Sequence, residues 1–219
     1  MKKAFTLLEL VFVIVVIGIL AALILPRTKT NPVQEAAVQV QSHIRYTQHL
    51  AMIDDKYDSN DVNWYKKRWQ ILFSSNGSSD NKWAYTIFAD TIGGSTGNPD
   101  EGEIAINPSN PNERMTGGQT SSVNLDINNA NFVGMRKMNL GLTYSITNVT
   151  FSSSCSTGSS TRLSFDHLGR PIKSNLSSNT APYDGNDLLQ SDCNITLTDG
   201  IETAIIQISP ETGYARLIF

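Results

Sequence analysis

The feature that most constrains this chain is an apolar run over residues 5–25, which contains a single ionisable side chain, Glu9. At about 1.5 Å per helical residue, a run of this length matches the roughly 30 Å hydrocarbon core of a bilayer, and it predicts a transmembrane helix segment. A carboxylate inside such a segment costs on the order of 3 kcal/mol, so its presence indicates a function. Glu9 is therefore expected to meet a cationic partner.

Three interpretations of this N-terminus compete. A cleaved secretory signal has a charge-free apolar region of about 7–15 residues before its cleavage site, whereas this run is longer and includes Glu9. A plain membrane anchor explains the length of the run but not the carboxylate. The third interpretation is a short leader that is removed before the apolar run and not after it.

A resemblance favours the third interpretation. Positions 2–9 read Lys-Lys-Ala-Phe-Thr-Leu-Leu-Glu, which resembles the prepilin peptidase signature of type IV pilins and type II secretion pseudopilins. The resemblance implies cleavage between Ala4 and Phe5, N-methylation of Phe5, and assembly through Glu9, which pairs with the N-terminal ammonium of a neighbouring subunit. It also implies a helix kink at Pro26. Ala4 departs from the glycine that usually precedes the cut in this family.

Residues 26–56 are expected to continue the N-terminal helix as an amphipathic segment. Within it, Asn31 and Pro32 fit the N-cap and first position of a fresh helix start. Apolar residues then recur at helical spacing at Val33, Ala36, Ala37, Val40, Ile44 and Ala51. This stripe predicts packing on the sheet of the same domain.

The remainder of the chain is rich in Asn, Ser, Thr and Gly, which favours short strands joined by polar turns. Candidate strands are 68–74, Trp83–Ala89, 104–106, 123–127, 142–146, 161–165, 195–198, 204–209 and 215–219, with a long irregular loop over 95–118. The predicted fold is α+β and pilin-like, with a long N-terminal helix packed on an antiparallel β-rich domain. Its expected parts are a leader peptide (1–4), a transmembrane segment (5–25), the amphipathic continuation (26–56) and a periplasmic β-rich domain (57–219).

The chain has two cysteines, Cys155 and Cys193, which are predicted to form one disulfide in an oxidising compartment. The alternative is a pair of buried free thiols. Closing a loop of about 38 residues stabilises a fold by about 4 kcal/mol in the chain-entropy model. No second Cys or His lies at ligand spacing from either cysteine, so neither a metal nor another cofactor is expected.

The sequence shows no pattern typical of an enzyme. A hydrolase needs a nucleophile, a histidine base and an orienting group, and the only histidines are His43, His49 and His167. The first two fall on the expected helix and the third in a turn, so exposed or structural histidines are the better interpretation. No glycine-rich phosphate loop or zinc-binding helix motif occurs. The chain is therefore not expected to be an enzyme.

Two segments near the C-terminus narrow the resemblance. Residues 163–170 and 208–216 resemble the strand-and-turn and the closing hairpin of the H-type (GspH/FimT-like) minor pseudopilins. Turn chemistry alone also explains both segments, because Gly169 and Gly213 fit loop positions that need a left-handed backbone.

One stretch, Trp-Tyr-Lys-Lys-Arg-Trp at 64–69, combines basic and aromatic side chains in the way that single-stranded nucleic acids are bound. It makes Lys66, Lys67 and Arg68 candidate nucleic-acid contacts and supports an alternative function, a FimT-like DNA-binding minor pilin for natural transformation. The simpler interpretation is a solvated strand entrance whose tryptophans pack on the core. The formal net charge of −3 gives no general support to a nucleic-acid partner.

The resemblance implies a minor pilin or pseudopilin of a type II secretion or type IV pilus machine, which acts by assembling into a filament or its tip. The expected partners are other pilins or pseudopilins, the prepilin peptidase, the inner membrane and secreted cargo, with DNA as a partner only in the alternative. The expected location is the bacterial inner membrane, crossed once, with the C-terminal domain in the periplasm or exposed on a filament.

Overall fold

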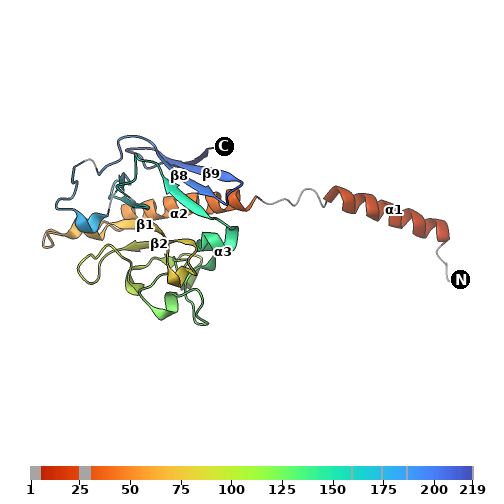
Figure 1. Cartoon of the computed structure of the whole chain (residues 1–219), viewed down its shortest axis with the longest axis horizontal. Coiled ribbons are helices and arrows are strands. Elements are labelled where there is room, and N and C mark those ends of the chain that lie inside the picture. The colour runs from red at the N-terminus through yellow and green to blue at the C-terminus, as the bar shows by residue number, and fades with distance from the viewer. Residues whose placement is uncertain (1–5, 25–30, 159, 174, 186, 219) are drawn as a thin grey trace. The chain divides into compact units, whose positions relative to one another are not determined.

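The computed structural model describes residues 6–24, 31–158, 160–173, 175–185 and 187–218. The chain divides into two compact units, Met1–Asn31 and Pro32–Phe219. In its described part the first unit consists of the helix α1 (Leu7–Ile24), and the second unit contains α2 (Pro32–Ile53), α3 (Leu140–Tyr144) and the strands (Figure 1).

The expectation of one long N-terminal helix is wrong. Helices α1 and α2 are separate elements that belong to separate compact units. Pro32 begins α2 because its fixed φ suits a first helical position, whereas the residue before a proline is disfavoured from the helical conformation. The fresh helix start at Asn31 and Pro32 is therefore confirmed, and the uninterrupted continuation through 26–56 is not.

The expectation of a membrane-spanning segment is also wrong. Nowhere in the described ranges is a helix both long and apolar enough to cross a bilayer. The expected single-pass location in the inner membrane, with a periplasmic domain, rested on this segment and is overturned by the same finding.

The amphipathic stripe of α2 is confirmed. All six of the apolar residues from which the stripe was predicted are buried, and Thr47 is buried with them. The Thr47 hydroxyl donates to the His43 carbonyl one turn earlier at 2.8 Å, so its polar group is satisfied inside the helix. Fully burying a branched apolar side chain stabilises the fold by about 2 kcal/mol, so this stripe is what holds α2 in place.

The second unit contains two antiparallel four-stranded sheets. The first sheet has the order β2-β1-β6-β7, and the second has the order β10-β9-β8-β5. The strands of the first are β1 (Trp69–Ser75), β2 (Trp83–Ala89), β6 (Arg162–Phe165) and β7 (Pro171–Lys173). Those of the second are β5 (Asn148–Phe151), β8 (Cys193–Thr198), β9 (Thr203–Ile208) and β10 (Ala215–Ile218).

Helix α2 packs against both sheets, contacting β1 and β6 of the first and β8, β9 and β10 of the second. Figure 1 shows α2 running between the β8–β9 strands and the β1–β2 strands. Alternate positions of the strands that contact α2 are buried, including Ile71 and Phe73 of β1 and Ile206 and Ile208 of β9. The α+β class and the antiparallel pairing are therefore as the sequence predicted.

The expected long loop over 95–118 holds a small hairpin, β3 (Ile106–Asn107) with β4 (Asn110–Arg114). Two expected strands are wrong, because 123–127 contains a 3-10 helix and 142–146 overlaps α3. Side chains of Ser122 and Asn139 cap these two turns. The short 3-10 helices are η2 (Trp64–Lys67), η3 (Gly77–Ser79), η4 (Glu101–Glu103), η5 (Val123–Leu125), η6 (Arg136–Met138) and η7 (Leu176–Ser178).

Candidate functional site

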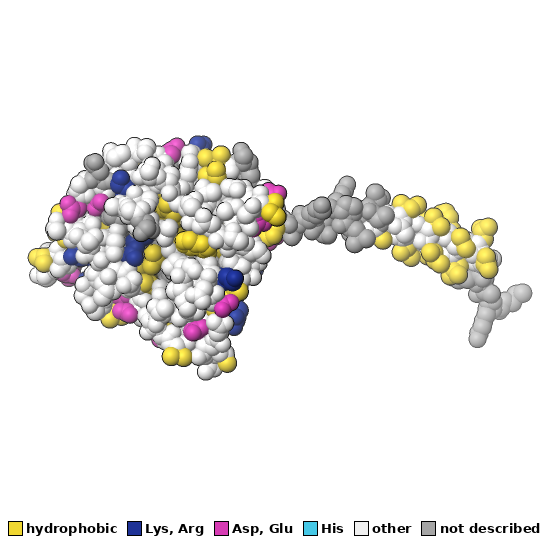
Figure 2. Space-filling model, in the orientation of Figure 1, with side chains coloured by type: hydrophobic (Ala, Val, Ile, Leu, Met, Phe, Trp, Pro, Cys, Tyr) yellow, Lys and Arg dark blue, Asp and Glu magenta, His cyan; other side chains and the backbone are white. Residues whose placement is uncertain are grey.

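The surface of α1 is apolar all around the helix. Its large hydrophobic side chains are exposed over 37% to 81% of their area between Leu7 and Leu20. Figure 2 shows these side chains along the visible face of α1. A helix that is hydrophobic on every side is normally buried, and an exposed apolar patch of this size marks an interaction site. α1 is therefore the candidate assembly element.

Glu9 lies in the first turn of α1 and is exposed. The Thr6 hydroxyl accepts the Glu9 amide at 3.3 Å, and the Glu9 carboxylate accepts the Thr6 amide at 3.5 Å. This is the reciprocal pattern of a capping box, and a carboxylate at this position also interacts favourably with the helix dipole. The signal was present in the sequence as Thr-x-x-Glu before an apolar run, and reasoning from the membrane alone missed it.

The capping contacts leave the Glu9 carboxylate able to bind another group. Both bonds to it are 3.5 Å long, near the limit for a hydrogen bond, and both join exposed groups. Glu9 therefore remains accessible to a cation from another chain. Three other positions of the predicted signature, Ala4, Phe5 and Pro26, lie outside the described residues.

The basic-aromatic stretch places its arginine inside the domain. Arg68 is 4% exposed, and its guanidinium lies 5.0 Å from the Trp64 ring centre and 4.6 Å from that of Tyr183. It donates to the Pro182 carbonyl at 2.6 Å. Burial lowers the pKa of Arg68, and the nearby Tyr183 and Asp166 oppose that shift. Arg68 thus joins the 64–69 segment to the distant 182–183 loop.

The two lysines of the stretch have different surroundings. Lys67 forms an ion pair with Asp61 at 2.6 Å, and this contact helps to lower the pKa of that carboxyl group. Lys66 lies 6.0 Å from the ring centre of Tyr65, a buried residue of the same 3-10 helix. The structure therefore does not gather Lys66, Lys67 and Arg68 on one surface. The sequence correctly marked this stretch as unusual, but its basic side chains contact groups of their own domain.

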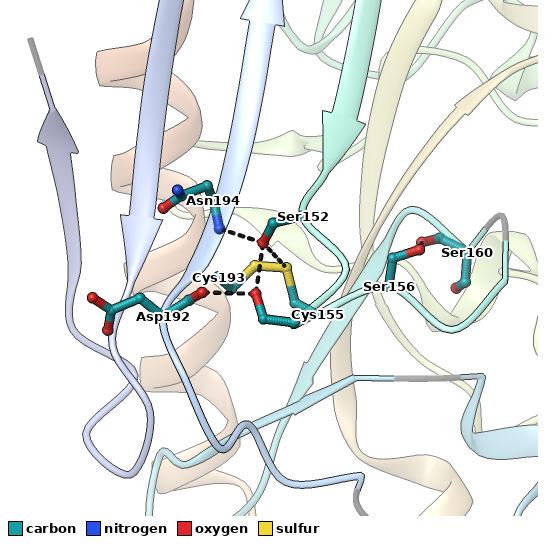
Figure 3. Close-up of a disulfide and its surroundings, with 8 residues drawn as sticks. Ser152, Cys155, Ser156, Ser160, Asp192, Cys193 and Asn194 are labelled. Carbon is teal, nitrogen blue, oxygen red and sulfur yellow. Dashed lines mark hydrogen bonds between the residues drawn. A yellow bond between two sulfur atoms is a disulfide. The ribbon is translucent and has the colours of Figure 1, made fainter.

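The predicted disulfide is confirmed. Cys155 and Cys193 are bonded, with 5.2 Å between their Cα atoms, and both are fully buried. The bridge joins the loop after β5 to the first residue of β8, and Figure 3 shows Ser152 beside it. The Ser152 hydroxyl accepts the Asn194 amide at 2.9 Å. These contacts fix the end of the second sheet on which α2 packs.

A buried polar network connects α2 to the first sheet. Nδ1 of His43 lies 2.7 Å from the Tyr85 hydroxyl, and the Gln39 amide donates to that hydroxyl at 2.8 Å. Tyr144 of α3 in turn donates to the Gln39 side-chain oxygen, Oε1, at 2.9 Å. The Tyr85 hydroxyl can accept from Gln39 and still donate to Nδ1 of a neutral His43. Burial lowers the pKa of His43 from 6.5 to about 4.

The other two histidines, His49 and His167, are exposed. Among the described residues, the side chains around His43 therefore join α2 to the first sheet and to α3. The sequence alone could not have identified the network around His43, because a lone histidine on a helix does not reveal which tyrosine will face it.

A second polar layer lies on the first sheet. Arg162 donates from Nη1 to the Gln70 and Asn175 side-chain oxygens at 3.0 Å each. Gln70 is paired in register with Ser164, and Asp90 lies at the end of β2. Among the described residues, the buried atoms Gln70 Nε2, Arg162 Nε, Ser164 Oγ and Asp90 Oδ1 have no hydrogen-bond partner. Such atoms weaken a fold unless water satisfies them.

Comparisons with known proteins do not assign this arrangement to a family. The chain matches no family model, no curated protein and no solved structure.

Proposed function

We propose that this chain is a minor pilin or pseudopilin subunit of a type II secretion or type IV pilus machine, and that it acts by assembly through α1. The observation that carries the proposal is the exposed apolar surface of α1, with one accessible carboxylate, Glu9, in its first turn. Covering apolar surface stabilises a complex by about 25 cal/mol per Å². The apolar helices of other subunits provide such a cover.

Glu9 gives this assembly its register. Removal of residues 1–4 would make Phe5 the N-terminal residue and Glu9 the fifth, as the resemblance of positions 2–9 implies. The carboxylate then pairs with the N-terminal ammonium of a neighbouring subunit, and a charge pair in an apolar interface specifies geometry more than it adds stability. N-terminal sequencing of the native chain tests the processing step, because the proposal requires a methylated Phe5 at the start.

The alternative of a DNA-binding minor pilin has less support. Arg68 is buried between two rings and Lys67 is engaged by Asp61. Binding of single strands depends on accessible cations and aromatic faces.

The assembly surface can be tested by photo-crosslinking in the source organism. A photoreactive residue at Val13, in the middle of α1, should form adducts with the N-terminal helices of other pilin subunits. The same residue at Ile201, which is 92% exposed in the second unit, is the matched control and should not form them. Adducts from Val13 that never include a pilin-like helix would contradict the proposal.

The two roles of Glu9 can be separated by two substitutions. Glu9→Gln keeps an acceptor for the capping box but removes the charge, whereas Glu9→Leu removes both. If the charge pairs between subunits, both variants should lose most of the Val13 adducts. If the carboxylate serves only as a cap, worth about 0.5 kcal/mol, Glu9→Gln should crosslink like the parent chain, and the assigned role in assembly would be wrong.

A further inference from the structure

A pocket of about 380 Å³ opens between the C-terminal half of α2 and residues 102–106. Tyr46 and Leu50, one helical turn apart on α2, form one wall, and Trp69 of β1 forms another. Ile104 and Ile106 complete the apolar lining, and Ile106 is 48% exposed. A volume of a few hundred Å³ with aromatic and aliphatic walls is typical of a binding pocket.

Asp54, which lies outside the lining, contacts two residues of the pocket wall, Trp69 and Lys56. Its carboxylate accepts the indole N–H of Trp69 at 2.9 Å and also forms an ion pair with Lys56. The Lys56 ammonium lies 5.3 Å from the centre of the Trp69 ring. Burial acts to raise the pKa of Asp54, but Lys56 and Trp69 hold it below its ordinary value. The orientation of Trp69 is therefore fixed before any ligand binds.

The lining of the pocket also includes a cation that its own domain does not neutralise. Arg114 of β4 lines the pocket, and its guanidinium has no hydrogen-bond or ion-pair partner among the residues that the structure describes. The neighbouring Glu103 does not serve as one, because its two carboxylate oxygens accept the backbone amides of Ile92 and Asp100. Arg114 is thus available to an anionic ligand.

We propose that this pocket binds a peptide segment of a partner protein in which an aromatic side chain is followed by a carboxylate side chain. The aromatic group occupies the space beside Tyr46, Leu50 and Ile106, and the carboxylate meets Arg114. A single carboxylate fits the charges better than a polyanion, because Glu103 already places a negative charge in the lining of the pocket. The site lies wholly in the second unit and does not depend on assembly through α1.

The three tryptophans of the chain provide the measurement. Nuclear magnetic resonance of the full chain, labelled with ¹⁵N at its indoles, reports on Trp69 in the pocket and on Trp64 and Trp83 away from it. The probes are acetyl-Gly-Phe-Glu-Gly-amide and the same peptide with Gln in place of Glu. The Glu peptide should shift the Trp69 signal selectively, with a Kd of about 1 mM, and should bind about fivefold more tightly than the Gln peptide.

Variants at Arg114 test whether its guanidinium binds the carboxylate of the peptide. Arg114→Gln should abolish the preference for the Glu peptide, whereas Arg114→Lys should keep most of it. Arg216→Gln is the matched control, since Arg216 is exposed on β10 and bonded to Gln207. An unshifted Trp69 signal, equal binding of the two peptides, or a preference that survives Arg114→Gln would overturn the proposal. Tighter binding of oligothymidylate at Trp69 would overturn it in favour of nucleic acid.

Discussion

Replacing His43 by glutamine should remove a large part of the acid sensitivity of the second unit. In the folded chain the imidazole is neutral near pH 7, because burial disfavours the imidazolium, and its Nδ1 lies 2.7 Å from the Tyr85 hydroxyl. In the unfolded chain nothing prevents protonation. Acid therefore favours the unfolded state at this residue.

The size of the effect follows from the two pKa values. The pKa of His43 falls from 6.5 to about 4 on folding because burial disfavours the imidazolium. The unfolded state binds more protons between these values, so stability is at its full level above pH 6.5 and is lost as the pH falls through 4. At about pH 4.5 the loss from this one group is about 2.5 kcal/mol.

Urea unfolding of the full chain at about pH 7 and about pH 4.5 measures this contribution. Glutamine does not titrate and retains an acceptor for Tyr85, so the difference in unfolding free energy between parent and His43→Gln should shift by about 2.5 kcal/mol in favour of the variant on acidification. His49→Gln is the matched control, because His49 is exposed on the same helix. If parent and His43→Gln show the same pH dependence, the buried neutral imidazole is the wrong explanation.

Three further predictions concern the second unit. Replacing Cys155 and Cys193 together by serine should lower the unfolding free energy by about 2–4 kcal/mol, measured by urea titration without reductant; an unchanged midpoint would show that the bridge does not limit stability. Burial raises the pKa of Asp90 to about 6, so the unfolding free energy of the parent falls as the pH rises through that value. The unfolding free energy of Asp90→Asn should therefore rise relative to that of the parent between about pH 5 and pH 7. Ser164→Ala should raise the thermal midpoint slightly, because it removes a buried hydroxyl without a partner in the described chain, worth about 1 kcal/mol; a clear decrease would reveal an ordered water at that hydroxyl.

Local patterns were sufficient where one short-range signal governed the outcome. The stripe from Val33 to Ala51 defined the buried face of α2, and Pro32 defined its start. The span Trp83–Ala89 was predicted with its observed bounds, because aromatic and β-branched residues favour a strand there. The disulfide followed from a count of two cysteines in an otherwise thiol-free chain.

Where side chains compete for partners, local patterns were not sufficient. The segment 142–146 has apolar residues that suit a strand, but Asn139 caps a helical turn and donates to the carbonyls of Ser79 and Gly117. Three strands were missed, β4, β5 and β7. They contain polar residues or proline, and their pairing depends on neighbours that are distant in the sequence.

By itself the sequence determined the apolar character of α1, the position of Glu9 at its start and the amphipathic pattern of α2, because each is a property of consecutive residues. Only the tertiary structure decided that Arg68 is enclosed by Trp64 and Tyr183, because the Tyr183 ring comes from a part of the chain that is distant in the sequence. It likewise decided that Arg114 and Trp69 line one pocket. The chemistry of a charged or aromatic side chain allows it to lie on the surface or in the core, and packing against residues distant in the sequence decides which of these positions it takes.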